Sequence, residues 1–426
     1  MSGPTAVRRF SADRRRLADQ LERLSTFGKF GETGVGRLAY TREDREATEV
    51  VRALMDEAGL VTSYDPVGNL FGRRPGQLAE PAPAVVSGSH LDGPPWGGRY
   101  DGTVGVLCAL EAVRLLEAGG IRTRYPVVAA VIGCEHLDRF GVSCLGSRAL
   151  SGKLTPEDLR RLRDAQGLSL WDVLAGEGYA PERLAEAVVG PREVRAFVEL
   201  HVEQGRVLED RGKRIGIVTA IPGPTRMRVR LRGRADHSGG TPMDLRRDAL
   251  TGAAELVLQV EALARRERVH GTVGTVGVLT VHPGAVHTIP GEVEFAVDIR
   301  GIDLASKRRV VEAFRQALDR VAADRGLGLE VRPSVDEAPV PCSAWVVDRI
   351  ADVCARLGID ALRMPSGGGH DAQHLAAVTE SGMIFVPSGG GIAHTPEEYT
   401  ALEDIALGAE ILADVLCSLA EEVPAG

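Results

Sequence analysis

The hydrophobic pattern of this chain changes near residue 213 and changes back near residue 338. Before 213, short apolar runs alternate with segments of helical periodicity, and after 338 the same alternation returns. Such alternation is typical of an α/β domain with a mainly parallel sheet. We therefore expect a mixed, mainly parallel α/β domain built from both ends of the chain, 1–212 and 338–426, with a second domain, 213–337, inserted between them. A chain of 426 residues is long enough for two such domains.

Apolar runs and helical spacing locate the main elements of the larger domain. The pair Gly119-Gly120, for example, ends a helix whose apolar residues recur at helical spacing. The expected strands are Val85–Ser87, Tyr125–Ile132, Phe197–Leu200 and Met383–Val386, and the expected helices are Glu43–Gly59, Asp101–Ala118 and Glu403–Leu419.

The inserted segment begins with a strand of strict alternation. Arg226–Arg232 reads RMRVRLR, which places three apolar residues on one face and four arginines on the other. Such a strand is half buried, and its second face lies in water or in an interface. The elements that follow complete the β-α-β-β-α-β order of a ferredoxin-like domain. They are a helix at Asp244–Arg268, strands near Thr272–Val281 and Glu292–Ile299, a helix near Leu304–Asp324 and a strand near Leu327–Arg332.

Charge and composition favour a small-molecule enzyme over a binder of nucleic acid or membrane. The formal net charge is −8, which argues against nucleic acid as the default partner. No apolar run approaches the 18 or so residues of a membrane span. The six cysteines form no CxxC pair, and the N-terminus lacks the apolar core of a signal peptide. We therefore expect a cytoplasmic protein.

The loop Ser87–Asp101 holds the first candidate functional residues. It reads SGSHLDGPPWGGRYD and places His90, Asp92 and Asp101 directly after an apolar run. Imidazole and carboxylate together hold divalent metals such as Zn, Mn, Co or Ni. A carboxylate two residues from a ligand histidine can also orient its ring. The alternative is a surface loop with an aspartate that caps the next helix.

Three further polar clusters follow predicted strands in the same way. In open α/β sheets, ligands bind beyond the carboxyl ends of the strands. A lone histidine is more often structural than a ligand, but four clusters at one sheet edge favour a metal site. The other three clusters are Glu135-His136-Leu137-Asp138, His201-Val202-Glu203-Gln204-Gly205 and His394 in a glycine-rich loop.

Two adjacent metal sites need a bridging carboxylate and a general base that is not a ligand. Asp101 is the best placed bridge, and Glu135 fits the base. A paired-metal site activates water between the ions and polarises a substrate carbonyl. We therefore expect two divalent ions, drawn from Zn, Mn, Ni and Co.

With these residues in view, the chain resembles the M20-type amidohydrolases of the N-carbamoyl-L-amino-acid hydrolase, β-ureidopropionase and allantoate amidohydrolase group. The resemblance covers nearly the whole length, and its motifs together are highly specific. They are GRLAYTRED (36–44), GNLFGRRPG (68–76), GSHLDGPPWGGRYDG (88–102), RFGVSCLGSRAL (139–150), ELHVEQG (199–205), ADHSGGTPMDLRRDAL (235–250), IPGEVEFAVDIR (289–300), GGGHDAQ (367–373) and MIFVPSGGGIAHTPEEY (383–399).

The resemblance implies a role for each candidate residue of the larger domain. His90, Asp101 and His201 would hold one metal. Asp101, His394 and the residue at position 136 would hold the second. Glu135 would be the base, and Asp92 would orient His90.

The resemblance also implies the substrate contacts. Gln204 and His237 would contact the amide or ureido group, and Arg300 would bind a substrate carboxylate as a bidentate clamp. Gly369 is a further expected substrate contact. The inserted domain carries His237 and Arg300, so it would act as a lid, and in this family it also forms a homodimer. Without the resemblance, Arg300 would be interpreted as a surface arginine at a strand end.

Two positions depart from the family pattern. The family usually has Glu-Glu where this chain has Glu135-His136. His136 can still bind Zn, Ni or Co, but it removes one negative charge and shifts the metal preference away from Mn. Alternatively, Asp138 supplies the carboxylate, or the second metal is lost. The family also tends to have Asn where this chain has His287, which either donates a hydrogen bond to the substrate or is a turn residue.

We therefore expect a metal-dependent hydrolase of a linear, non-peptide C–N bond. The expected substrate is an N-carbamoyl-L-amino acid or a related small carboxylate-bearing molecule. Two alternatives stay open. One is a specialised amide hydrolase with an altered substrate and second metal site, and the other is a non-catalytic binding homologue.

Overall fold

The computed structural model describes residues 10–422 and divides into two compact units. Unit 1 runs up to Thr219 and resumes at Cys342, and unit 2 is Ala220–Pro341. Residues 1–9 and 423–426, which the predicted larger domain includes, lie outside the described residues. The chain thus leaves unit 1 once and returns to it once.

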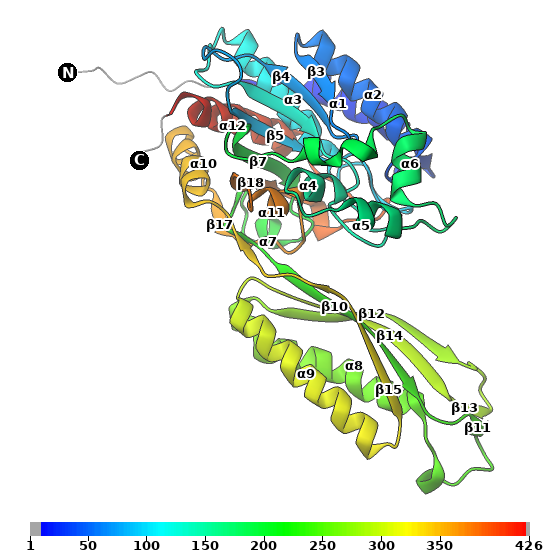
Figure 1. Cartoon of the computed structure of the whole chain (residues 1–426). Coiled ribbons are helices and arrows are strands. Elements are labelled where there is room, and N and C mark those ends of the chain that lie inside the picture. The colour runs from blue at the N-terminus through cyan, green and yellow to red at the C-terminus, as the bar shows by residue number, and fades with distance from the viewer. Residues whose placement is uncertain (1–9, 423–426) are drawn as a thin grey trace. The chain divides into compact units, whose positions relative to one another are not determined.

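Unit 1 is built on an eight-stranded sheet (Figure 1). The strand order is β17-β8-β18-β7-β5-β6-β4-β3, and the central strands β18, β7, β5 and β6 are parallel to one another. The pairs β18–β8, β6–β4 and β4–β3 are antiparallel, so the sheet is mixed. The strands are β3 (Val61–Tyr64), β4 (Leu70–Arg74), β5 (Ala84–Ser89), β6 (Val127–Val131), β7 (Val194–Val202), β8 (Gly216–Val218), β17 (Leu362–Met364) and β18 (Glu380–Val386).

Helices cover this sheet on both faces (Figure 1). The largest core lies between the sheet and α1, α2, α3, α10 and α12. The helices are α1 (Arg14–Ser25), α2 (Arg42–Glu57), α3 (Thr103–Ala118), α4 (Leu145–Leu150), α5 (Pro156–Arg161), α6 (Leu170–Gly176), α7 (Val207–Asp210), α10 (Ala344–Leu357), α11 (Asp371–Leu375) and α12 (Leu402–Glu421), with 3-10 turns η1 (Pro181–Ala187) and η4 (Gly389–Gly391) and a small hairpin β1 (Lys29–Phe30) and β2 (Gly34–Val35).

Strands β5 and β6 are buried along their whole length, and β7 and β18 are buried except at their first residues, because helices cover both faces of the sheet. Side chains alternate between the two faces of a strand. In β7, Val198, Leu200 and Val202 therefore join the large core. Glu199 and His201 point to the other face of the sheet. The pleat of β7 thus places a buried carboxyl and a buried imidazole on one side.

Unit 2 has the predicted β-α-β-β-α-β order. Its four long strands pair antiparallel in the order β12-β14-β10-β15. Two helices pack on the apolar face of this sheet. The elements are β10 (Gly223–Arg232), α8 (Ala249–Arg266), β12 (Val273–His282), β14 (Glu292–Gly301), α9 (Leu304–Asp324) and β15 (Gly328–Asp336), with short pieces β9 (Ala220–Ile221), β11 (Asp236–His237), η2 (Met243–Leu245), η3 (Arg268–His270), β13 (Thr288–Ile289) and β16 (Val340–Pro341).

The fold class predicted from the sequence is confirmed, with local differences. The predicted helix Asp244–Arg268 begins at Ala249, because the Asp248 side chain accepts the amides of Leu250 and Thr251 and caps the helix there. Apolar periodicity did not reveal the antiparallel strands β3 and β4 at the sheet edge, which are short and mix polar with apolar residues. Among residues 10–422, no helix is long and apolar enough to cross a membrane.

Candidate metal centre

Four loops at one edge of the unit 1 sheet carry the candidate ligands. The neighbouring strands β18, β7, β5 and β6 run parallel, so their carboxyl ends lie at the same edge. His90 follows β5, His201 lies near the end of β7, His136 follows β6 and His394 follows β18. This is the edge at which open α/β sheets bind ligands. The structure brings all four histidines around one carboxylate, that of Asp101.

Asp101 uses both of its oxygens. Oδ1 lies 3.2 Å from His201 Nε2, and Oδ2 lies 3.0 Å from His136 Nε2 and 3.2 Å from His394 Nε2. Burial by itself would raise the pKa of Asp101, but hydrogen bonds from these three imidazoles hold it well below its usual range. The carboxylate therefore stays ionised and faces ring nitrogens on two sides, as a bridging ligand must.

His90 and His201, which we call the inner pair, are held by main-chain carbonyls. His90 Nδ1 lies 2.8 Å from the carbonyl of Asp92, and His201 Nδ1 lies 2.9 Å from that of Val202. A carbonyl only accepts, so each Nδ1 carries the proton and each Nε2 is turned inward. The two Nε2 atoms lie 3.4 Å apart. With Asp101 they form a buried group that could hold a metal ion, which we call the inner site.

The donor chemistry of the inner site fits a cation. Burial lowers the pKa of His90 to about 4. Burial has the same tendency at His201, but Asp101 outweighs it and raises the pKa to about 9. Two inward nitrogens beside a carboxylate can share a proton or bind a divalent ion that replaces it. Imidazole and carboxylate are suitable ligands for Zn and similar metals.

His136 and His394, which we call the outer pair, form a second candidate group with Asp101, the outer site. The His136 side chain is 9% exposed and that of His394 is 50% exposed. Asp138 lies on the opposite side of the His136 ring, with Oδ2 3.7 Å from Nδ1. The structure therefore turns His136, and not Asp138, toward Asp101.

The carboxylate of Asp92 contacts main-chain amides. Its Oδ1 accepts the amide of Glu135 at 3.0 Å and its Oδ2 accepts that of His136 at 2.9 Å, whereas Oδ1 lies 3.8 Å from His90 Nδ1. We predicted that this carboxylate orients His90, but the main-chain carbonyl of Asp92 makes that contact. The carboxylate instead fixes the loop that presents Glu135 and His136.

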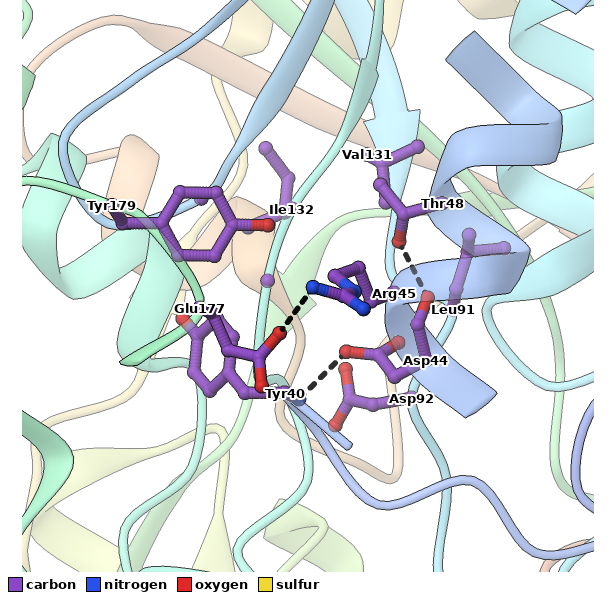
Figure 2. Close-up of a pocket in the computed structure, with 12 residues that line it drawn as sticks. Tyr40, Asp44, Arg45, Thr48, Leu91, Asp92, Val131, Ile132, Glu177 and Tyr179 are labelled. Carbon is purple, nitrogen blue, oxygen red and sulfur yellow. Dashed lines mark hydrogen bonds and ion pairs between the residues drawn. The ribbon is translucent and has the colours of Figure 1, made fainter. Parts of the chain in front are cut away.

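Behind Asp92 lies a narrow pocket lined by polar side chains of α2 and neighbouring loops (Figure 2). Asp44 accepts the Tyr40 amide at 2.7 Å, and Arg45 pairs with Glu177 at 3.4 Å (Figure 2). Burial raises the pKa of Asp44 to about 6 and that of Asp92 to about 7. The side chains that line this pocket pack against the loop of Asp92, and none of them is a candidate metal ligand.

Glu135 forms a further candidate group with His90 and His136, one that does not include Asp101. Its Oε2 is 3.5 Å from His136 Nε2 and 3.9 Å from His90 Nε2, and its side chain is 12% exposed. Cys144 Sγ donates to Oε1 at 3.5 Å. A carboxylate that borders both rings and retains access to solvent can exchange a proton with a bound molecule.

Gln204 closes the polar cluster on another side. Its Nε2 lies 2.9 Å from Asp101 Oδ1 and 2.9 Å from His394 Nε2. A β-carbon added at Gly368 would lie 3.3 Å from Gln204 Oε1, so the loop that contains Gly369 runs beside this amide. Gln204 and His394 both have φ of 59°, a left-handed conformation that is uncommon outside glycine and is frequent at functional sites.

Two buried carboxyls at the site, those of Glu199 and Glu398, were not predicted from the sequence. Glu199 accepts the Ser89 hydroxyl at 2.8 Å and the Ala372 amide at 3.0 Å. Glu398 accepts main-chain amides of the loops that carry Asp101 and His394. Both residues lie within quoted motifs, ELHVEQG and HTPEEY, so their presence there was the available clue. Their depth and their partners depend on the fold.

Three predicted substrate contacts lie in unit 2. His237 is exposed, and its Nδ1 accepts the amides of Gly239 at 3.1 Å and Gly240 at 2.9 Å. His287 is also exposed, and its carbonyl accepts the Ser238 amide at 3.0 Å. Arg300 pairs with Asp298 at 2.9 Å on β14. Within unit 2, His237 lies on β11, and His287 directly precedes the partner strand β13.

Comparison with known proteins shows the family of this chain. The model of peptidase family M20/M25/M40 matches residues 88–418. An N-carbamoyl-L-amino acid amidohydrolase from Geobacillus stearothermophilus is 40% identical over 95% of this chain and 98% of that protein. A ureidoglycolate hydrolase from Arabidopsis thaliana is 37% identical over 96% of this chain and 87% of that protein.

A crystal structure of an amidase of the hydantoinase/carbamoylase family from Burkholderia multivorans is also similar. It matches with a TM-score of 0.88 and 35% identity over 97% of this chain and 99% of that chain. The family resemblance inferred from the motifs is confirmed. The chain belongs to peptidase family M20/M25/M40, a family of metal-dependent hydrolases, and within it to the group that contains the carbamoyl and ureido amidohydrolases.

Proposed function

We propose that this protein hydrolyses a linear, non-peptide C–N bond of an N-carbamoyl-L-amino acid or a related ureido or amide substrate. The observation that carries the proposal is the cluster in which Asp101 faces three imidazoles while the carboxylate of Glu135 borders the same space. The similar amidohydrolases support the choice of bond.

In this proposal the inner and outer sites each hold one divalent ion, with Asp101 as the shared ligand. Such ions would polarise the substrate carbonyl and lower the pKa of water. Because His136 replaces a carboxylate, one anionic ligand and four imidazoles would serve two cations. Imidazole favours Zn, Ni and Co over Mn, so we expect Zn, Co or Ni to bind more tightly than Mn.

Glu135 is the proposed general base. One of its carboxylate oxygens takes a proton from the attacking water while the water oxygen bonds to the carbonyl carbon. The same carboxyl then gives that proton to the leaving nitrogen as the C–N bond breaks. Asp92 fixes the main chain on which Glu135 stands, so the base is oriented before substrate arrives.

His237 is the proposed donor to the carbonyl oxygen. Two amides donate to its Nδ1, so the neutral ring carries its proton on Nε2, where it can donate to a developing oxyanion. Gln204 and the main chain at Gly369 contact the amide end of the substrate in this proposal. Arg300 binds the substrate carboxylate, with Asp298 holding its guanidinium in place, and His287 contributes a further hydrogen bond.

An activity screen with separately loaded metals tests the proposal. Purified protein loaded with Zn²⁺, Co²⁺, Ni²⁺ or Mn²⁺ is assayed for amine or ammonia release from N-carbamoyl-L-amino acids, allantoate, ureidoglycolate and N-acyl amino acids. The Glu135→Gln variant keeps the metal content and loses turnover by about 10²–10⁴-fold, the usual worth of a positioned base. No turnover of any substrate with any metal would leave the non-catalytic homologue as the better description.

The position of His136 favours a second candidate, a hydrolase specialised for a different amide. His136 Nε2 lies 3.0 Å from the shared carboxylate, where the related enzymes are expected to place a carboxylate of their own. The His136→Glu variant distinguishes the two candidates. If that variant gains activity on ordinary carbamoyl amino acids that the natural chain lacks, the specialised function is supported.

We further propose that unit 2 mediates a homodimer as well as acting as a lid. The arginine face of β10 is neutralised within the unit, for example by Arg230 with Glu294 at 2.8 Å. The edge strand β12 instead exposes Val273, Val278 and Leu279. An exposed apolar edge strand is normally covered. Light scattering should therefore give a mass twice that of the 45.4 kDa chain. The Val278→Lys variant should give the mass of a single chain.

Localisation in the cytoplasm stays part of the proposal. All six cysteines are free, and Cys108, Cys134, Cys144 and Cys354 are buried. Free thiols of this kind are compatible with a reducing compartment.

A further inference from the structure

A single buried carboxylate joins two of the three loops that carry the outer site. Glu398 Oε1 accepts the amide of Tyr100 at 2.9 Å and the amide of Asp101 at 2.8 Å. Its Oε2 accepts the amide of His394 at 3.2 Å. The Glu398 residue is 4% exposed. One side chain therefore holds the main chain at both Asp101 and His394, which lie far apart in sequence.

The inner pair does not depend on Glu398 in this way. His90 and His201 are held by the carbonyls of Asp92 and Val202. His394, by contrast, is half exposed on a glycine-rich loop, and its backbone has a left-handed φ of 59°. A residue in that conformation needs support from its surroundings. The bond from the His394 amide to the buried Glu398 carboxylate supplies such support.

We propose that Glu398 is a positioning residue for the outer cation, because it keeps the Asp101 carboxylate and the His394 imidazole within reach of one ion. This inference rests on the proposed metal-dependent function. Residues that orient metal ligands typically contribute about 10–100-fold to metal affinity. Removing the Glu398 contacts should therefore weaken the outer site more than the inner site, because the outer site loses support at both Asp101 and His394, whereas the inner site loses it at Asp101 alone.

The variant Glu398→Gln removes the hydrogen bonds to one of the two loops with little change in side-chain volume. The glutamine amide has one oxygen and one NH₂ group. Its oxygen can accept the main-chain amides of one loop, but its NH₂ group and the N–H of the other loop are both donors and cannot form a hydrogen bond. Glu397→Gln is the matched control, because Glu397 is the exposed neighbour.

A second variant displaces Glu398 without changing any ligand or charge. A β-carbon at Gly98 would lie 2.5 Å from Glu398 Cβ and 2.7 Å from its Oε1, so Gly98→Ala must push that side chain away. Gly93→Ala is its control, since a β-carbon at Gly93 meets nothing within 4 Å. Gly93 and Gly98 belong to the same loop, so a general effect of alanine there would appear in both variants.

The test is a titration of metal-free protein with Co²⁺, followed by ligand-field absorption and by metal analysis after gel filtration. We expect two equivalents per natural chain. In Glu398→Gln and Gly98→Ala we expect the second equivalent to weaken by about 10–100-fold and the first by a clearly smaller factor, because only Asp101 of the inner ligands contacts Glu398. The two controls should match the natural chain. Circular dichroism of each metal-free variant establishes that it is folded.

Each other outcome overturns a specific statement. If both variants bind the second Co²⁺ as tightly as the natural chain, or if the two equivalents weaken by the same factor, the role of Glu398 in positioning the outer site is wrong. A natural chain that binds one equivalent has no outer site for Glu398 to position, and the inference is again wrong. A natural chain that binds no cation instead refutes the proposed metal-dependent function.

Discussion

The inner and outer pairs face the same carboxylate but are held in different ways. His90 and His201 lie at the ends of central strands, are almost fully buried and are oriented by main-chain carbonyls. His136 and His394 lie on loops whose main chain is fixed by the carboxylates of other residues. The inner site is therefore part of the sheet framework, whereas the outer site depends on contacts between loops.

This difference bears on which candidate metal ligands can be replaced by another residue type. A change at the inner pair disturbs buried strand ends, and few residue types fit there. In the proposed centre, the loop of the outer site presents the imidazole of His136 where the family resemblance implies a carboxylate. Variation of the metal centre within one fold is thus expected on the outer side.

The largest expected effect comes from removing one histidine of each pair. His201→Ala should abolish binding of the inner cation and, because it removes the imidazole beside Asp101 Oδ1, should weaken the outer cation as well. Turnover should fall by at least about 10³-fold, within the range that catalytic groups contribute. His394→Ala should abolish only the outer cation. Metal analysis and Co²⁺ titration of both variants measure the difference. Equal loss of metal in the two variants would remove the distinction between the pairs.

A smaller effect is expected when metal is withdrawn from the natural chain. A chelator in limiting amount should remove the outer cation about tenfold faster than the inner one, since support by surrounding residues changes metal affinity by about that factor or more. Aliquots taken over time are analysed for metal content and for turnover. Release of both cations with a single rate would contradict the comparison.

The smallest effect is expected at Glu203, which lies two residues after His201 in sequence but has its carboxylate on main-chain amides of α7. Its carboxylate accepts the amides of Val207 at 2.7 Å and Leu208 at 2.9 Å and so begins α7. Glu203→Gln should lower the free energy of unfolding by about 0.5–2 kcal/mol, the worth of a helix cap. Metal affinity and turnover should stay unchanged, and a clear fall in metal affinity would assign Glu203 to the metal centre.

Features that depend on neighbouring residues could be predicted from the sequence. Apolar runs located the central strands, and the polar clusters after them placed His90, His136, His201 and His394 at one sheet edge. The strict alternation of Arg226–Arg232 identified β10 as half buried. Its neighbours on either side, β14 and β15, could not be assigned from that pattern, because strand order depends on pairing between distant segments.

Contacts between loops could not be predicted from the sequence. The residue pair Asp92 and His90 suggested an orienting carboxylate, but the main-chain carbonyl of Asp92 reaches the ring first. The role of Glu398 depends on a loop that folds back from 298 residues away to reach Tyr100. No periodicity or spacing reports such a contact.

The sequence by itself determined the family, the fold class and the set of side chains available for metal chemistry, because strand periodicity and short motifs are local properties. The tertiary structure decided which nitrogen of each ring faces Asp101, and that His136 and not Asp138 faces that carboxylate. It also decided that Glu398 joins the loops of Asp101 and His394. These features depend on directions and distances between segments that only the packed sheet brings together.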